Sequence, residues 1–100
     1  MNGRGYEFEW DDLKANTNLR KHGVSFDLAR TVFNDDRLVT VADLEHSNTE
    51  ERWFSVGRAS NGVLLTVVYL WLEGAVTIKI RLISARKATQ TETRYYQEEV

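Results

Sequence analysis

The chain has 100 residues, of which 42% are hydrophobic and 28% charged, and this composition predicts a single globular domain over residues 1–100. The net charge of −2 argues against a generic nucleic-acid coat protein, because such proteins are strongly basic. The absence of Cys excludes disulfides, Cys-ligated iron–sulfur clusters and thiol catalysis. The first twenty residues lack the apolar run of a signal peptide, and no apolar stretch reaches the roughly 20 residues that span a bilayer. We therefore expect a cytoplasmic protein with no membrane partner.

The N-terminal part reads as a strand followed by a helix. Residues 6–10 alternate aromatic and acidic side chains, the period of two that is typical of a short half-buried strand. Asp11 or Asp12 is suited to cap a helix that runs to about Lys21, and Gly23 is suited to end it in a left-handed conformation.

A second helix and a run of strands follow. Ser25 is a good N-cap for a helix from Phe26 to Phe33, whose apolar residues recur at helical spacing. Alternation, apolar runs and turn signals then predict four strands. They are expected at residues 37–43, 51–58, 63–72 and 75–84. Thr89 and Glu92 have the spacing of a capping box and open a final helix to about Glu98.

This order predicts an α+β fold. Strands joined by short turns form an antiparallel meander, so we expect a four-stranded antiparallel sheet, with or without a short extra strand at the N-terminus. Two N-terminal helices and one C-terminal helix pack on it.

The last expected strand carries a candidate anion site. Lys79 and Arg81 project from one face of the strand, and Arg86 and Lys87 follow where the chain leaves the sheet. The Ser84 hydroxyl and the start of a helix lie nearby, and helix N-termini favour anions. The alternative is that Arg81 and Arg86 pair with carboxylates and only brace the sheet.

Two histidines are candidates for proton transfer or RNA contact. His46 lies in a polar segment close to Glu51 and is suited to act as a general acid or base near neutral pH, although a loop imidazole is more often simply solvated. His22 is placed near a helix C-terminus, where its charged form complements the helix dipole. Neither belongs to a close-spaced metal motif, so we expect no metal centre and no cofactor.

Four blocks of sequence resemble one family. They are residues 8–11 leading to 18–26, residues 46–53 with Gly57, residues 64–69, and residues 81–89 before Arg94, Tyr95 and Tyr96. In this order they resemble the BrnT toxins of type II toxin–antitoxin systems, which have a RelE-like ribonuclease fold. The resemblance covers residues from about 7 to 97.

The resemblance implies a metal-independent endoribonuclease that inhibits translation by cutting RNA. It also implies a BrnA-type antitoxin as partner. Operator DNA is then contacted only indirectly, through the antitoxin. For such chemistry we assign Arg81 and Arg86 to transition-state charge and Ser84 to the phosphate. The candidates for proton transfer, which the sequence does not rank, are His46, Tyr69 and Glu51. The expected RNA-binding residues are Lys21, His22, Arg52, Arg58, Lys79 and Lys87.

The chain departs from the family pattern at two places. Many members carry His at the position of Tyr69, and the final helix is less basic than the resemblance leads us to expect. A non-catalytic or degenerate toxin-like module that only binds its antitoxin is therefore the alternative prediction. A sequence-specific DNA-binding protein is opposed by the acidic balance and by the lack of a basic recognition helix.

Overall fold

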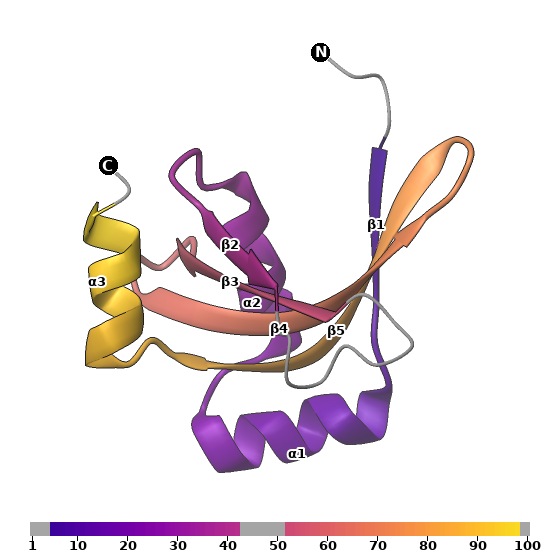
Figure 1. The fold of residues 1–100 in the computed structure, drawn as a ribbon. Helices are drawn as coiled ribbons and strands as arrows, with labels where there is room; N and C mark the ends of the chain where they lie inside the picture. Colours follow the sequence, from indigo (N-terminus) through magenta and orange to yellow (C-terminus); the bar gives the residue numbers. More distant parts are fainter. Residues whose placement is uncertain (1–4, 43–51, 99–100) are drawn as a thin grey trace.

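In the computed structural model, which describes residues 5–42 and 52–98, five strands form one mixed sheet with three α-helices and a 3₁₀ helix packed around it (Figure 1). The elements in chain order are β1 (Gly5–Glu9), α1 (Asp12–His22), α2 (Phe26–Ala29), the 3₁₀ helix η1 (Arg30–Asn34), β2 (Val39–Ala42), β3 (Arg52–Arg58), β4 (Leu64–Glu73), β5 (Thr77–Lys87) and α3 (Gln90–Glu98). None of the described helices is long and apolar enough to cross a bilayer.

The strand order is β1-β5-β4-β3-β2, and this corrects the expected sheet. β2 to β5 pair antiparallel, as predicted, but β1 joins the edge of β5 in parallel, from Gly5 opposite Thr77 to Glu9 opposite Arg81. The expectation of a four-stranded antiparallel sheet is therefore wrong for the sheet as a whole. Alternation of side chains predicts a strand equally well in either direction, so the sequence pattern does not indicate parallel pairing.

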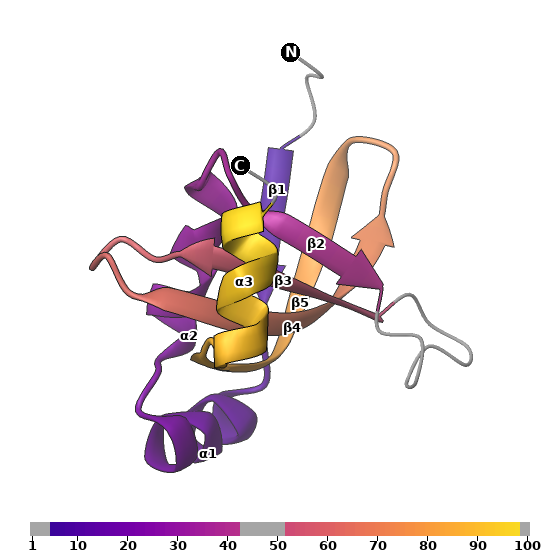
Figure 2. The same ribbon diagram turned by 60° about the vertical axis from the view of Figure 1, so that its left-hand side comes forward.

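The two faces of the sheet have different roles. On one face, which we call the core face, Ile80, Leu82 and Tyr69 are buried in the cluster that also contains Phe26 and Val32 from α2 and η1. The other face, which we call the cationic face, carries the polar side chains of β5 and is partly covered by α3. Figures 1 and 2 show α3 on the side of the sheet away from α2.

The helix caps follow the sequence signals. The Asp11 carboxylate accepts hydrogen bonds from the amides of Leu13 and Lys14, and Gly23 ends α1 with a φ of 71°. The capping box is formed: the Glu92 amide donates to the Thr89 hydroxyl at 3.2 Å.

The second predicted helix starts where expected but changes its winding. Ser25 caps α2, whose four residues are followed by 3₁₀ structure up to Asn34. The hydroxyl of Thr31 donates to the Leu28 carbonyl at 2.6 Å, a local bond that accompanies the tighter turn. The tighter winding still buries Val32 completely against the sheet.

Candidate functional site

An irregularity in β5 brings its polar residues to one face. Val68 on β4 pairs with Ser84, but the next residue, Tyr69, pairs with Leu82, so Ile83 is an extra residue on β5. Without this bulge, strict alternation would place Arg86 on the face opposite Arg81. With it, the cationic face of β5 carries Lys79, Arg81, Ser84 and Arg86.

Arg81 lies against a carboxylate of the neighbouring strand. Its guanidinium donates to the Glu9 carboxylate at 2.9 Å, and the Lys79 ammonium lies 3.7 Å from the same carboxylate. These side chains are 34% to 46% exposed, so the pairs are screened by water and contribute at most about 1 kcal/mol each. An incoming phosphate can therefore compete with Glu9 for Arg81 at low cost. Glu9 was not among the predicted site residues, because its position opposite Arg81 depends on the parallel pairing of β1.

Arg86 is held more firmly. Its guanidinium donates two hydrogen bonds to Glu92 of α3, at 2.7 and 2.8 Å, and the same carboxylate accepts from the Thr66 hydroxyl and the Thr89 amide. Burial alone would raise the pKa of Glu92, but these hydrogen bonds and the charge of Arg86 lower it to about 2. The pairing in turn raises the pKa of Arg86. This is the bracing role that the sequence left open as an alternative, with Glu92 as the partner.

A groove of about 280 Å³ lies between α1 and the bulge of β5, and we call it the α1 groove. Its lining contains Lys21, His22 and Ser84, three of the predicted site residues, together with Lys14 and Thr17, which the sequence analysis did not select. Lys14, Thr17 and Lys21 recur at the i, i+3 and i+7 spacing of one helix face, which is the signal that could have identified them. None of the residues that line the groove is acidic.

The α1 groove exists because α1 is fastened to the edge of β5. β1 pairs with β5 only as far as Arg81, and beyond it the side chain of Asn18 takes the place of a strand. The Asn18 amide donates to the carbonyls of Ala85, at 2.8 Å, and Val24, and its oxygen accepts from the Ala85 amide at 3.1 Å.

The remaining predicted RNA-binding residues are more dispersed. Arg52 lies in one row with Leu70 and Arg81 across three strands. Arg58 lies at the far end of β3, where it donates to the Gly62 carbonyl and its guanidinium is 5.6 Å from the ring centroid of Tyr96. Lys87 is exposed at the end of β5.

Tyr69 is separated from the cations. It lies on the core face and is only 2% exposed, and its hydroxyl is 2.7 Å from that of Ser55. Burial raises the pKa of Tyr69, so the phenol stays protonated at neutral pH. The structure therefore does not bring Tyr69 together with Arg81, Ser84 and Arg86.

His46 and Glu51 lie outside the described residues. Within residues 5–42 and 52–98, no group of three or more His, Asp or Glu side chains is arranged to hold a metal ion.

Comparison with known proteins gives two matches. Residues 10–92 match the family model described as "Ribonuclease toxin, BrnT, of type II toxin-antitoxin system". Among solved structures, the chain is similar to the ribonuclease toxin BrnT of Brucella abortus, with 20% sequence identity and a TM-score of 0.59, over 86% of this chain and 99% of that one. At this identity the structural likeness concerns the fold alone. No curated protein matches the chain.

Proposed function

The chain belongs to the BrnT family of ribonuclease toxins of type II toxin–antitoxin systems, and from this premise we propose that it is a metal-independent endoribonuclease that inhibits translation by cutting RNA. We further propose that the fold is RelE-like, that the chain acts in the cytoplasm, and that a BrnA-type antitoxin neutralises it.

The observation that carries this proposal is the position of Ser84. Ser84 belongs to the polar row of β5 with Arg81, and it also lines the α1 groove with Lys21. The two features therefore form one continuous cationic track across the edge of the sheet, on a chain whose net charge is negative. Such a track suits the phosphates of a single RNA strand.

The proposed reaction is an internal transesterification. The ribose 2′-oxygen loses its proton and forms a bond to phosphorus, the bond from phosphorus to the 5′-oxygen breaks, and the leaving oxygen gains a proton. The products are a 2′,3′-cyclic phosphate and a free 5′-hydroxyl. Arg81 would stabilise the charge that develops on the phosphoryl oxygens, and the Ser84 hydroxyl would position the phosphate.

We propose two described groups for proton transfer. Glu9 is released as a free carboxylate when a phosphate replaces it as the partner of Arg81, and His22 lies in the α1 groove with Ser84. His46 and Glu51 stay predictions for the same role. We assign Tyr69 to the core, because its hydroxyl is hydrogen-bonded to Ser55, and Arg86 to the attachment of α3, because its guanidinium is hydrogen-bonded to Glu92.

The alternative function is a non-catalytic module that only binds an antitoxin. It is favoured by one observation, that both Arg81 and Arg86 are paired with carboxylates in the free chain.

The deciding experiment mixes the purified, antitoxin-free chain with end-labelled RNA in excess EDTA. We expect fragments that end in a 2′,3′-cyclic phosphate, and a loss of at least about a hundredfold in rate for Arg81→Ala. Arg30→Ala is the matched control, because Arg30 also forms an exposed ion pair, with Asp27 at 3.6 Å, but lies on η1 outside the track. It should cleave like the wild type.

Two results would count against the proposal. A folded Arg81→Ala variant that cleaves at the wild-type rate would refute the site assignment. RNA that stays intact with the folded wild-type chain, both alone and with translating ribosomes, would favour the antitoxin-binding module.

A further inference from the structure

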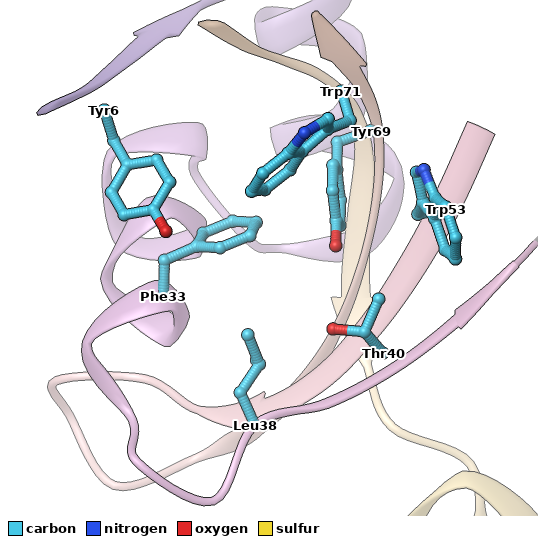
Figure 3. A pocket seen from close by; sticks show the side chains of 7 residues that line it. All are labelled: Tyr6, Phe33, Leu38, Thr40, Trp53, Tyr69 and Trp71. Carbon is cyan, nitrogen blue, oxygen red and sulfur yellow. The ribbon is translucent and has the colours of Figure 1, made fainter. Parts of the chain in front are cut away.

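A pocket of about 380 Å³ lies on the core face of the sheet beside η1, and we call it the aromatic pocket (Figure 3). Its lining comes from four strands, from η1 and from the residue that precedes β2. The residues are Tyr6, Phe33, Leu38, Thr40, Trp53, Tyr69 and Trp71. None of them is charged, and five of the seven are aromatic.

Ring contacts fix the walls of the aromatic pocket. The rings of Tyr6 and Trp71 meet edge to face with their centroids 5.9 Å apart, and those of Phe33 and Tyr69 with theirs 5.0 Å apart. Tyr6 is nevertheless 51% exposed. An exposed apolar patch around a preformed pocket is typical of a surface that a partner covers.

The surroundings favour a protein side chain over an RNA base. The residues of the cationic track lie on the opposite face or along α1, and none of them lines the aromatic pocket. A base would bring its phosphate with it, and the lining offers no cation to meet that charge. The hydroxyls of Thr40 and Tyr69 are already bonded to Ser55, so they contribute little to recognition of a base edge.

β1 offers a backbone edge next to the aromatic pocket. It is the last strand in the sheet order, so its outer edge pairs with no other described strand. Tyr6 on β1 faces the pocket, and a strand added beside β1 would direct alternate side chains to the same face. Glu7, also on β1, is exposed and forms no ion pair with a described residue. Glu7 lies opposite Lys79 of β5, whose ammonium is 3.7 Å from Glu9, so the Glu7 carboxylate is the acidic group that β1 offers to a basic residue of a partner.

We propose that β1 and the aromatic pocket form a docking site for an extended segment of the protein antitoxin. The segment pairs with β1, inserts an aromatic or branched aliphatic side chain beside Tyr6, and places Lys or Arg at Glu7. The inference rests on the antitoxin that membership of the family implies, and it is independent of whether the chain cuts RNA.

The test measures the affinity of the chain for its cognate antitoxin, co-expressed and purified as the complex and then separated. Tyr6→Ser should weaken binding at least tenfold, as expected for an aromatic anchor at an interface. Tyr95→Ser is the matched control, since Tyr95 is 42% exposed on α3, and it should leave the affinity within twofold. Glu7→Lys leaves the lining of the pocket intact and should also weaken binding, with Glu7→Gln in between.

A second readout identifies the occupant. In amide and indole NMR spectra of the labelled chain, antitoxin should shift the signals of β1 and of the Trp53 and Trp71 indoles, whereas a cleavage-resistant RNA should shift those of Lys21 and Ser84. RNA cleavage by free Tyr6→Ser should match the wild type. Unchanged antitoxin affinity in both Tyr6→Ser and Glu7→Lys would overturn the inference. Indole shifts caused by the RNA would also overturn it, because the pocket would then bind a base. Indole shifts caused by raising the concentration of the chain alone would overturn it too, because the pocket would then be an interface between copies of the chain.

Discussion

At the scale of single residues, one buried amide replaces a missing strand. Asn18 is 5% exposed, and its side chain bonds both the amide and the carbonyl of Ala85 at the edge of β5 where β1 has ended. Because an unpaired buried backbone group costs about 1 to 3 kcal/mol, these hydrogen bonds of Asn18 help to hold α1 against the sheet. The α1 groove, and with it the position of Lys21 beside Ser84, depends on this contact.

The first prediction concerns this contact. Asn18→Ala should lower the free energy of unfolding by about 2 to 4 kcal/mol, because the polar groups of Ala85 lose their partners. Urea unfolding followed by tryptophan fluorescence measures the change. Asn16→Ala, on the exposed side of the same helix, corrects for the higher helix propensity of Ala and should be neutral or slightly stabilising. Equal stability of the two variants would show that the Asn18 bonds contribute nothing net.

The second prediction uses the lowered pKa of Glu92. Its pKa of about 2 in the folded chain lies below the ordinary value of 4.5, so its ionised form stabilises the fold at neutral pH. That contribution is complete above pH 4.5 and is lost as the pH falls toward 2. Glu92→Gln should therefore be less stable than the wild type by on the order of 2 kcal/mol at pH 7, and the gap should shrink between pH 4.5 and pH 2. Unfolding curves at several pH values test this, and a gap that is independent of pH would contradict it.

At the scale of elements, local chemistry predicts where helices and strands begin, and long-range pairing decides how they meet. The caps at Asp11, Ser25 and Thr89 are formed as their sequence signals predict. The parallel pairing of β1 leaves no local signal, because neither its direction nor its partner affects the alternation of side chains. The bulge at Ile83 is also absent from the pattern, since strict alternation over residues 75–84 fits the sequence equally well.

The candidate site was also predictable only where its residues are close together in the sequence. Arg81 and Ser84 are predicted from the run of charged and hydroxyl residues at the end of the last strand, and Lys21 enters through the family resemblance; in the structure Ser84 lies on the same face of β5 as Arg81 and lines the α1 groove with Lys21. Glu9 was missed because its contact with Arg81 joins residues 72 positions apart. Tyr69 is a candidate because of its place in the family pattern. In the structure its side chain lies on the core face, where its hydroxyl is hydrogen-bonded to that of Ser55.

The third prediction concerns the packing of η1 on β3. A Cβ added at Gly57 would lie 2.6 Å from Leu38 Cδ1, 3.2 Å from Val32 Cβ and 3.3 Å from the Val32 carbonyl oxygen. Leu38 can rotate away, but Val32 is fully buried, so Gly57→Ala should cost about 1 to 3 kcal/mol. Gly5→Ala is the control, because a Cβ there meets nothing within 4 Å. Thermal unfolding should show a midpoint that is several degrees lower for Gly57→Ala but unchanged for Gly5→Ala. Equal midpoints for the two variants would contradict this packing.

At the scale of the whole molecule, a chain with a net charge of −2 binds an anion only where its cations are concentrated. Glu9 and Glu92 neutralise part of the cationic face, whereas Lys14 and Lys21 in the α1 groove form no ion pair with a described residue. For the proposed RNA contact we therefore expect a local attraction in which few phosphates are held at once. Such a protein should bind RNA with a weak dependence on salt.

The last prediction measures this dependence. For single-stranded RNA, log K falls with log salt by about 0.7 for each phosphate that is neutralised, so about four contacts give a slope between about −2 and −3. Lys21→Gln should reduce the size of this slope by about 0.7 and should weaken binding most at low salt. Arg20→Gln removes the same charge from the neighbouring position of α1, but Arg20 does not line the groove, so its slope should equal that of the wild type. Fluorescence anisotropy with a 2′-O-methyl oligoribonucleotide over a series of salt concentrations gives both slopes. If the two variants lose the same amount, the attraction comes from the charge of α1 as a whole, and the groove is not where the phosphate binds.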